Sequence, residues 1–214
     1  MIEHKTVSLA DQVFEHLEND ILSGKYQRGE ILTESKLSAE LGVSRTPIRE
    51  ALRRLGQEHI IEESGKGSVV LGISEGDLRD IFLIREKVEG LAAAQAAERC
   101  SKEQLDKLRE TVELQEFYVE KHDAEQIKQM DNRFHELVYK YSGSTIFYDT
   151  LIPLHKKVQK YRKAAMESSS RAVSSVREHK EIYNAIEKRD SALAEKCAIE
   201  HVRNAYRHII GKDR

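Results

Sequence analysis

The chain lacks long apolar runs, and no stretch among its 214 residues approaches the roughly 18 apolar residues of a membrane-spanning helix. Cysteine is scarce: Cys100 and Cys197 stand alone in segments of helical pattern, without a C-x-x-C motif. This usage indicates two reduced thiols rather than disulfides. The first residues do not resemble a secretion signal. These absences predict a cytoplasmic protein that makes no contact with a membrane.

A surplus of positive charge is missing as well. The formal net charge is −2 at pH 7, and residues 1–72 hold nine Lys and Arg against twelve Asp and Glu. Bulk charge therefore gives no support for a nucleic-acid binder, and such a function has to rest on local placement. Residues 45–54 form such a local basic segment, because they contain four arginines and one glutamate. A short basic helix edge can neutralise phosphates even in an acidic domain.

This arginine-rich segment belongs to a pattern typical of a helix-turn-helix. Gly42 can take the left-handed conformation that ends one helix, and Ser44 can accept a hydrogen bond from the first amides of the next. Pro47 falls in the first turn of that second helix, where its missing N–H costs nothing. Two stripes follow at helical spacing. The apolar stripe is Ile48, Ala51, Leu52 and Leu55, and the basic stripe is Arg45, Arg49 and Arg53.

Residues 1–72 predict a winged helix-turn-helix domain. A first helix precedes Ser23-Gly24, Thr33 can cap a second, and the arginine helix is the third. Two strand-like runs follow, and the connecting residues 62–68 contain glycines that suit the tip of a β-hairpin. Three helices and a hairpin describe this fold.

Residues 73–214 predict an all-α helical bundle, so the whole chain is expected to be mainly α. Strand signals vanish after Ser74, and helix breaks recur often enough for about six helices. Ser101-x-x-Gln104 resembles a capping box, and Pro153 is expected to start, kink or interrupt a helix. The serine-rich residues 168–170 predict a linker.

Four side chains of the second domain have the types and spacing of metal ligands. Asp131 and His135 are four residues apart on one predicted helix and share a face, while His179 and His201 lie on the last two long helices. Three imidazoles and a carboxylate suit a divalent transition ion, although a lone histidine on a helix is more often a partly buried or surface side chain. The other histidines have no such spacing and are expected to be structural or solvent-facing: His4, His16, His59, His122, His155 and His208.

These motifs together resemble the GntR family of bacterial transcription regulators, specifically its FadR-like subfamily with an all-helical FCD ligand-binding domain. The resemblance covers nearly the whole chain. In the first domain it rests on residues 21–24, 29–34 and above all 41–55. In the second domain it rests on Ile84-Arg85-Glu86, residues 88–93, Asp131-x-x-Phe134-His135, Glu178-His179, and Asp190-x-x-x-Ala194 leading to His201.

The resemblance implies a DNA-binding surface in the first domain. Arg45 and Arg49 can reach guanine edges from the recognition helix, and the helix N-terminus offers amides and hydroxyls to phosphate. Two positions depart from the family: His59 and Gly56 stand where glycine and an acidic residue are usual. A non-glycine at the first must tolerate the backbone of the turn before the wing. The residues implied at the DNA are Ser44, Arg45, Thr46, Pro47 and Arg49, with Gly65 and Lys66 at the wing tip in the minor groove.

The resemblance also implies a metal and effector site in the second domain. Arg85 would bind a small carboxylate effector placed against the metal, with Asn204 as a further contact. The alternative for Arg85 is an ion pair with Glu89 or another acid within the bundle. The implied ion is zinc first, with nickel, manganese or iron as alternatives. The implied ligands are Asp131, His135, His179 and His201.

The function implied is that of a homodimeric repressor whose affinity for a two-fold symmetric double-stranded DNA operator changes when the effector binds. Two alternatives stay open. One is a metal-dependent hydrolytic enzyme fused to a DNA-binding domain, although no histidine has a Glu three residues before it and no H-E-x-x-H motif occurs. The other is a DNA-binding regulator in which the metal is purely structural.

Overall fold

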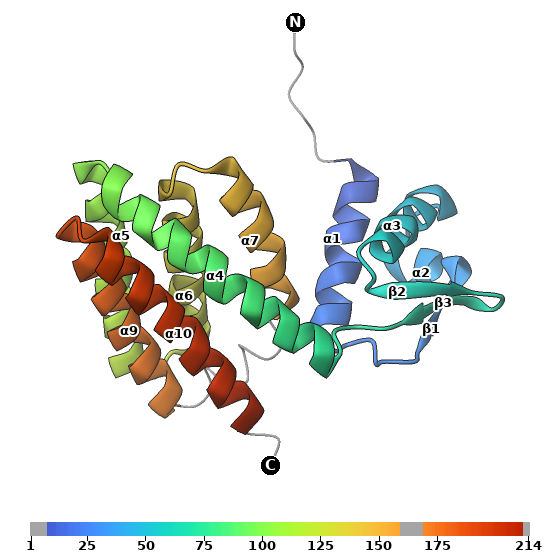
Figure 1. Cartoon of the computed structure of the whole chain (residues 1–214). Coiled ribbons are helices and arrows are strands. Elements are labelled where there is room, and N and C mark those ends of the chain that lie inside the picture. The colour runs from blue at the N-terminus through green and yellow to red at the C-terminus, as the bar shows by residue number, and fades with distance from the viewer. Residues whose placement is uncertain (1–7, 159–168, 212–214) are drawn as a thin grey trace, which may run out of the picture. The chain divides into compact units, whose positions relative to one another are not determined.

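The computed structural model describes residues 8–158 and 169–211, and the chain divides into two compact units, Met1–Glu75 and Gly76–Arg214. Each unit has its own apolar core. Most residues are helical, and the first unit adds one small antiparallel sheet (Figure 1). The predicted fold class, a winged helix-turn-helix followed by a helical bundle, is confirmed. Within the described ranges, none of the helices has both the length and the apolar character needed to cross a bilayer.

Three helices build the first unit: α1 (Leu9–Leu22), α2 (Glu34–Leu41) and α3 (Arg45–Gln57). Ser8 and Asp11 form a capping box at the start of α1, and Thr33 caps α2. Gly42 ends α2 with φ 66°, the left-handed conformation expected from the sequence. Helices α1 and α3 pack together over the core. The predicted apolar stripe of α3 lies in that core: Ile48, Ala51, Leu52 and Leu55.

The expected capping bond of α3 is absent. Ser44 occupies the N-cap position, but its side chain makes no capping hydrogen bond. A capping hydroxyl binds the N–H of the second or third helical residue, and the third residue here is Pro47, which has none. Ser44 is exposed to solvent at the start of the helix.

A three-stranded antiparallel sheet completes the first unit, with the strand order β1-β3-β2. The register sets Ser64 opposite Gly67, so only Gly65 and Lys66 form the turn of the hairpin. The predicted connection over residues 62–68 is therefore too long, since β2 and β3 each extend into it. The sequence did not predict β1, because two residues are too few for a periodic pattern. The strands are β1 (Ile31–Leu32), β2 (Ile61–Ser64) and β3 (Gly67–Val70).

Two left-handed backbone positions shape the wing. At Gly67, φ is 137°, and a Cβ would lie 2.6 Å from the carbonyl oxygen of Leu32. Only glycine allows β1 to approach β3 so closely. His59, in the turn between α3 and β2, has φ 56°. The backbone at this position thus has the left-handed conformation that suits glycine, although the residue is histidine.

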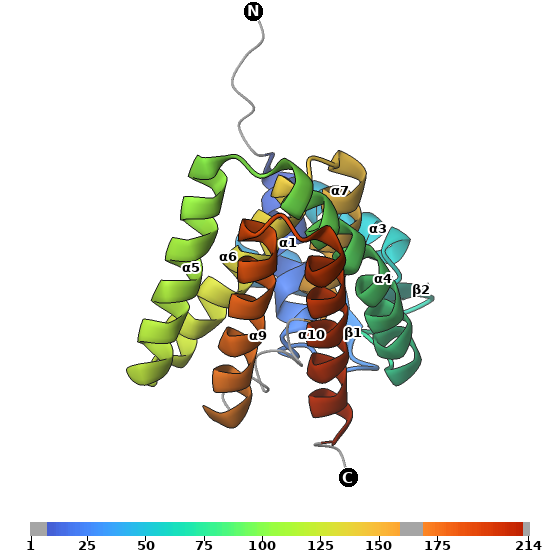
Figure 2. The same ribbon diagram turned by 60° about the vertical axis from the view of Figure 1, so that its left-hand side comes forward.

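In the described part of the second unit there are six helices, and four of them, α5, α6, α9 and α10, lie side by side (Figure 2). Helix α9 contacts α5 and α10, and α5 contacts α6. Helix α4 approaches α10 at Gly90, where a Cβ would lie 2.8 Å from Cγ1 of Ile199. The bounds are α4 (Glu75–Arg99), α5 (Lys102–Glu120), α6 (Ala124–Tyr141), α7 (Thr145–Lys157), α9 (Ser169–Glu187) and α10 (Ser191–Gly211).

The helix boundaries follow most of the sequence signals. Ser101 and Gln104 form the expected capping box of α5, and Pro153 lies inside α7. The predicted serine-rich linker is wrong over Ser169 and Ser170, which lie in α9. Ser168 and His4 lie outside the described residues.

Candidate functional sites

The arginine helix presents its N-terminal end to solvent. Ser44, Arg45, Thr46 and Arg49 are exposed, and Pro47 is half-buried. The apolar stripe on the opposite side is held in the core, which fixes the orientation of these side chains. Free backbone amides at such a helix start, with arginines beside them, suit phosphate groups and base edges.

Arg49 is already engaged by a carboxylate of the neighbouring helix. Its Nε lies 2.7 Å from Oε1 of Glu34, and its Nη2 lies 2.8 Å from Oε2. These hydrogen bonds hold the pKa of Glu34 below its ordinary value. The contact is a two-point ion pair between the first residue of α2 and the recognition helix α3.

The wing tip is also open to solvent. Gly65 and Lys66 are exposed, and the backbone N–H of Lys66 donates to Oγ of Ser64 at 3.3 Å. A Cβ at Gly65 would meet no atom within 4 Å, so the tip has no packing neighbour there. A protruding hairpin with one lysine at its end suits insertion into a groove of DNA.

The four predicted metal ligands come together in the second unit. His135 on α6, His179 on α9 and His201 on α10 place ring nitrogens within 4.8 Å of one another. The Nε2 atoms of His135 and His201 are 3.2 Å apart, and Oδ1 of Asp131 lies 3.7 Å from Nε2 of His179. None of these four residues is more than 4% exposed. Three separate helices thus bring the histidines together, with Asp131 next to His179.

An oxygen atom faces the other ring nitrogen, Nδ1, of each histidine. Nδ1 of His179 lies 2.8 Å from Oε1 of Gln115, and Nδ1 of His201 lies 2.7 Å from a carboxylate oxygen of Glu178. Nδ1 of His135 lies 3.2 Å from Oε2 of Glu89. Carboxylate and amide oxygens only accept, so each Nδ1 carries the proton.

Nε2 is therefore the ring nitrogen that each histidine turns toward the cluster. Burial lowers the pKa of His201 to about 4, although Glu178 opposes this shift, so the ring is neutral at pH 7. The Nε2 atoms of His135 and His201 lie 3.2 Å apart, a separation that favours a cation or a shared proton between them. The donor set thus has the polarity of a cation site.

The spacing also fits a transition ion. An ion bound to two imidazole nitrogens at about 2.0–2.1 Å holds them roughly 2.9–3.4 Å apart when the bond angle is about 90–110°. The observed separation of 3.2 Å between the Nε2 atoms of His135 and His201 falls in this range. Nitrogen donors with one carboxylate suit zinc, nickel, iron or manganese. The three histidines therefore fit such an ion, and Asp131 lies beside them, with Oδ1 3.7 Å from Nε2 of His179.

Arg85 is buried beside this cluster in an ion pair. Its Nε donates to Oε1 of Glu89 at 2.6 Å, and both side chains are almost fully buried. Burial raises the pKa of Glu89, but Arg85 and His135 outweigh it and hold the pKa well below its ordinary value. The intrahelical ion pair expected as the alternative for Arg85 is present. Nη1 of Arg85 is nevertheless buried without a hydrogen-bond partner, which leaves a donor for an anion.

A second buried arginine supports His201. Nη1 and Nη2 of Arg171 each donate to Glu178 at 2.9 Å, and Nδ2 of Asn204 donates to the same carboxylate at 3.0 Å. Burial raises the pKa of Glu178, but hydrogen bonds from His201 and Arg171 lower it to about 2. Asn204, which the sequence assigned to the effector, thus contacts the carboxylate that orients His201. Arg85 neutralises Glu89 behind His135, and Arg171 neutralises Glu178 behind His201. Asp131 is therefore the carboxylate that would supply negative charge to an ion at the histidine cluster.

Sequence reasoning missed the polar residues behind the histidines. Gln115 and His179 are 64 residues apart, so no local spacing reveals their contact. His155, which was expected to be structural or solvent-facing, is buried, with Nε2 3.1 Å from Oδ1 of Asn132. His155 also groups with Glu89 and His135 as possible ligands, but the guanidinium of Arg85 on Glu89 makes that group unfavourable for a cation.

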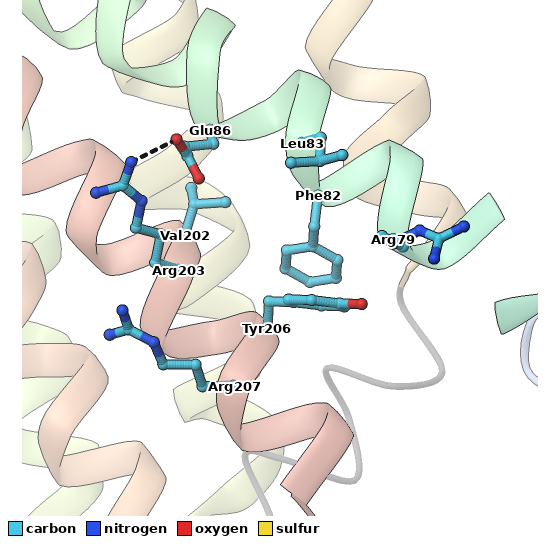
Figure 3. Close-up of a pocket in the computed structure, with 8 residues that line it drawn as sticks. All are labelled: Arg79, Phe82, Leu83, Glu86, Val202, Arg203, Tyr206 and Arg207. Carbon is cyan, nitrogen blue, oxygen red and sulfur yellow. Dashed lines mark hydrogen bonds and ion pairs between the residues drawn. The ribbon is translucent and has the colours of Figure 1, made fainter. Parts of the chain in front are cut away.

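A shallow groove of about 250 Å³ lies between α4 and α10 (Figure 3). Its floor is aromatic, because the rings of Phe82 and Tyr206 lie 5.2 Å apart. Arg203 and Glu86 form an ion pair at 2.8 Å along one side. The Phe82 ring also lies 5.0 Å from the guanidinium carbon of Arg85, so Phe82 contacts both the groove and the buried arginine.

Known sequences and families match both units. The profile of bacterial regulatory proteins of the gntR family matches residues 9–70, and that of the FCD domain matches residues 80–204. The HTH-type transcriptional repressor RspR of Escherichia coli is 27% identical over 198 residues, which cover 92% of this chain and 87% of RspR. The gluconate operon transcriptional repressor of Bacillus licheniformis is 35% identical over 118 residues, covering 55% of this chain and 49% of that protein.

Solved structures match the fold over nearly the whole chain. Escherichia coli McbR/YncC has a TM-score of 0.81 at 24% identity, covering 98% of this chain and 100% of that one. A GntR transcriptional regulator of Rhodococcus sp. RHA1 has a TM-score of 0.74 at 20% identity, covering 96% and 99%. At these identities the likeness establishes the arrangement of elements.

Proposed function

We propose, from the premise that the chain belongs to the GntR family of bacterial transcription regulators and carries an FCD domain, that it is a repressor whose operator affinity depends on a metal-bound carboxylate effector. Membership makes the chain a DNA-binding transcription regulator and excludes the hydrolytic-enzyme alternative, because the relatives are regulators. The proposed domain division is residues 1–72 for DNA binding and 73–214 for sensing.

Operator recognition is assigned to the exposed end of α3 and to the wing. Arg45 and Arg49 would donate to guanine edges, and the neighbouring hydroxyls and amides would hold phosphates. The wing tip, Gly65 and Lys66, would enter the minor groove. The exposure of these side chains, with the apolar stripe of α3 buried behind them, carries this half of the proposal. The full set is Ser44, Arg45, Thr46, Pro47, Arg49, Gly65 and Lys66.

Effector sensing is assigned to the buried histidine cluster. Asp131, His135, His179 and His201 would hold a divalent transition ion, zinc first among the candidates. When bound, the ion offers a Lewis-acidic position to a carboxylate. A carboxylate effector would need an open position on the ion in addition to those that these four side chains would occupy. The convergence of three buried imidazoles carries this half of the proposal.

Arg85 is assigned to the effector carboxylate. Its unpartnered Nη1 supports this role, because a buried guanidinium donor favours an anion. The groove between α4 and α10 is lined by Phe82, whose ring contacts the guanidinium of Arg85. Asn204 would act from behind, through Glu178. The competing function, a purely structural metal, is supported by the complete burial of the ligands.

A homodimer in the bacterial cytoplasm completes the proposal. A two-fold symmetric operator requires two copies of the recognition helix, related by the same symmetry. An effector then alters repression by changing the spacing or mobility of the paired first units.

The DNA-binding half is tested by two arginine variants of the same helix. Arg49→Ala is expected to abolish specific binding to a selected operator while helix content and dimer mass stay unchanged. Arg53→Ala removes the same charge from an exposed position further along α3 and is expected to weaken binding to all duplexes alike. Unchanged operator affinity in the Arg49 variant would contradict the assignment.

The sensing half is tested by native mass spectrometry of protein purified without added metal. A dimer with one chelatable transition ion per subunit is the expected result. A metal-free dimer would remove the ion from the proposal and leave Arg85 as the principal effector contact. Chelation that unfolds the second unit, with no carboxylate able to change operator binding, would instead establish a structural metal.

A further inference from the structure

The ion pair between Arg49 and Glu34 uses one edge of the guanidinium and leaves another edge open. Glu34 accepts from Nε and Nη2 of Arg49, at 2.7 and 2.8 Å. The end-on edge, formed by Nη1 and the second N–H of Nη2, keeps its donors. That edge has the spacing that binds O6 and N7 of guanine. One arginine can therefore bind a carboxylate and a guanine at the same time.

We propose that Glu34 is a positioning residue for base recognition: it holds the Arg49 guanidinium in the orientation that selects guanine. The inference rests on the proposed role of Arg49 in operator binding and adds a residue outside the recognition helix. Glu34 acts through Arg49 and makes no base contact of its own.

The solvent exposure of this pair argues against a role in stability. The side chain of Arg49 is 70% exposed and that of Glu34 is 31% exposed. Ion pairs at this exposure contribute little to folding, because water screens them and ordering the long side chain costs entropy. The same ordering is useful for binding, since an arginine held in place before contact loses less rotamer freedom on the DNA.

The base of the contact is rigid. Glu34 is the first residue of α2, directly after the capping residue Thr33. Helix α2 packs against α3, and its Leu37 is fully buried. The carboxylate is thus fixed relative to the recognition helix by backbone and core contacts rather than by a flexible loop.

A matched control exists in the same unit. Glu30 also pairs with a basic side chain, since Nζ of Lys36 lies 3.0 Å from its Oε1, and its side chain is 32% exposed. Glu30→Gln and Glu34→Gln remove the same charge at similar exposure. Any general gain in DNA affinity from lower negative charge is therefore common to both variants.

The experiment first uses the full-length chain to select binding sites from a pool of randomised DNA duplexes. It then measures the affinity for the selected site and for a second site, in which the guanine that depends on Arg49 is changed to adenine. That guanine is the position at which a change to adenine weakens binding of the wild type but not the residual binding of Arg49→Ala. Glu34→Gln is expected to reduce the guanine-over-adenine preference roughly three- to tenfold, whereas Glu30→Gln leaves it unchanged. Thermal unfolding of each variant checks that the first unit is folded.

The outcomes separate this inference from the function beneath it. Selection of no motif by the wild-type chain would overturn both. A motif that Arg49→Ala leaves unchanged would overturn the recognition role of Arg49 and, with it, the role of Glu34. A guanine preference lost in Arg49→Ala but intact in Glu34→Gln would overturn the inference about Glu34 alone. Equal losses in Glu34→Gln and Glu30→Gln would make the effect one of charge and overturn it as well.

Discussion

Three buried histidines each have Nδ1 facing an oxygen atom from another helix. His179 on α9 faces Gln115 on α5, and His201 on α10 faces Glu178 on α9. These contacts fix both the ring orientation and the nitrogen that carries the proton. The property that suits the cluster to a metal therefore belongs to pairs of residues and not to single positions.

The ligand assignment predicts the metal content of a single variant. His179→Ala removes one of three converging nitrogens and is expected to lower the metal content of purified protein well below one equivalent per chain, measured by elemental mass spectrometry. His16→Ala, at an exposed position of α1, is the control and should retain the full equivalent. A full equivalent in the His179 variant would remove this residue from the ligand set.

The outer contacts predict a smaller effect on affinity. Gln115→Leu removes the acceptor of His179 Nδ1 and is expected to weaken metal binding about 10–100-fold without changing its stoichiometry. Gln115→Glu keeps an acceptor and should restore affinity. Competition with a chromophoric chelator measures both, and equal affinities for Gln115→Leu and the wild type would show that this contact does not tune the ion.

Arg85 requires a variant that leaves no unpaired charge behind. Removing it alone would bury Glu89 without its partner, at a cost of about 3–5 kcal/mol. The double variant Arg85→Met/Glu89→Gln avoids this and keeps an acceptor for His135. With acetate as the simplest carboxylate, calorimetry on metal-loaded protein is expected to show binding to the wild type and none to the double variant, at equal metal content. Equal loss of metal would make Arg85 structural.

Among the secondary-structure elements, the wing depends on one glycine and not on its neighbour. Gly67 has φ 137° and lies against the carbonyl of Leu32, whereas Gly65 has open space around it. Gly67→Ala is expected to destabilise the first unit by about 1–3 kcal/mol through backbone strain and the displaced strand β1. Gly65→Ala should stay within about 0.5 kcal/mol of the wild type. Urea unfolding measures both, and similar values would contradict the wing geometry.

Elements were easier to predict than the contacts between them. The apolar stripe of α3 and the left-handed Gly42 follow from spacing and residue type over a few positions. Strand β1 has two residues and forms only because β3 pairs with it. The predicted capping hydrogen bond of Ser44 is wrong because Pro47 has no backbone N–H to donate, which the sequence already showed. Gln115 and Glu178 could not be assigned, since helix packing alone brings them to the histidines.

For the whole molecule, the two separate cores predict two responses to metal. An ion that binds only the folded second unit, at a free concentration about 100 times its Kd, stabilises that unit by about 2.7 kcal/mol and leaves the first unit unchanged. Calorimetry with and without chelator is expected to shift one transition and not the other. A common shift of both transitions would mean that the units unfold as one.

The burial of the proposed ligands also bears on the rate of metal exchange. His179 is 0% exposed and none of the other three proposed ligands exceeds 4%, so an ion would enter or leave only when helices of the bundle part transiently. Exchange would then be slow compared with binding to DNA, and dilution or a brief fall in free metal would not empty the site. The metal content of such a regulator would reflect the metal supply at the time its second unit folded, and not the supply at the time it binds DNA.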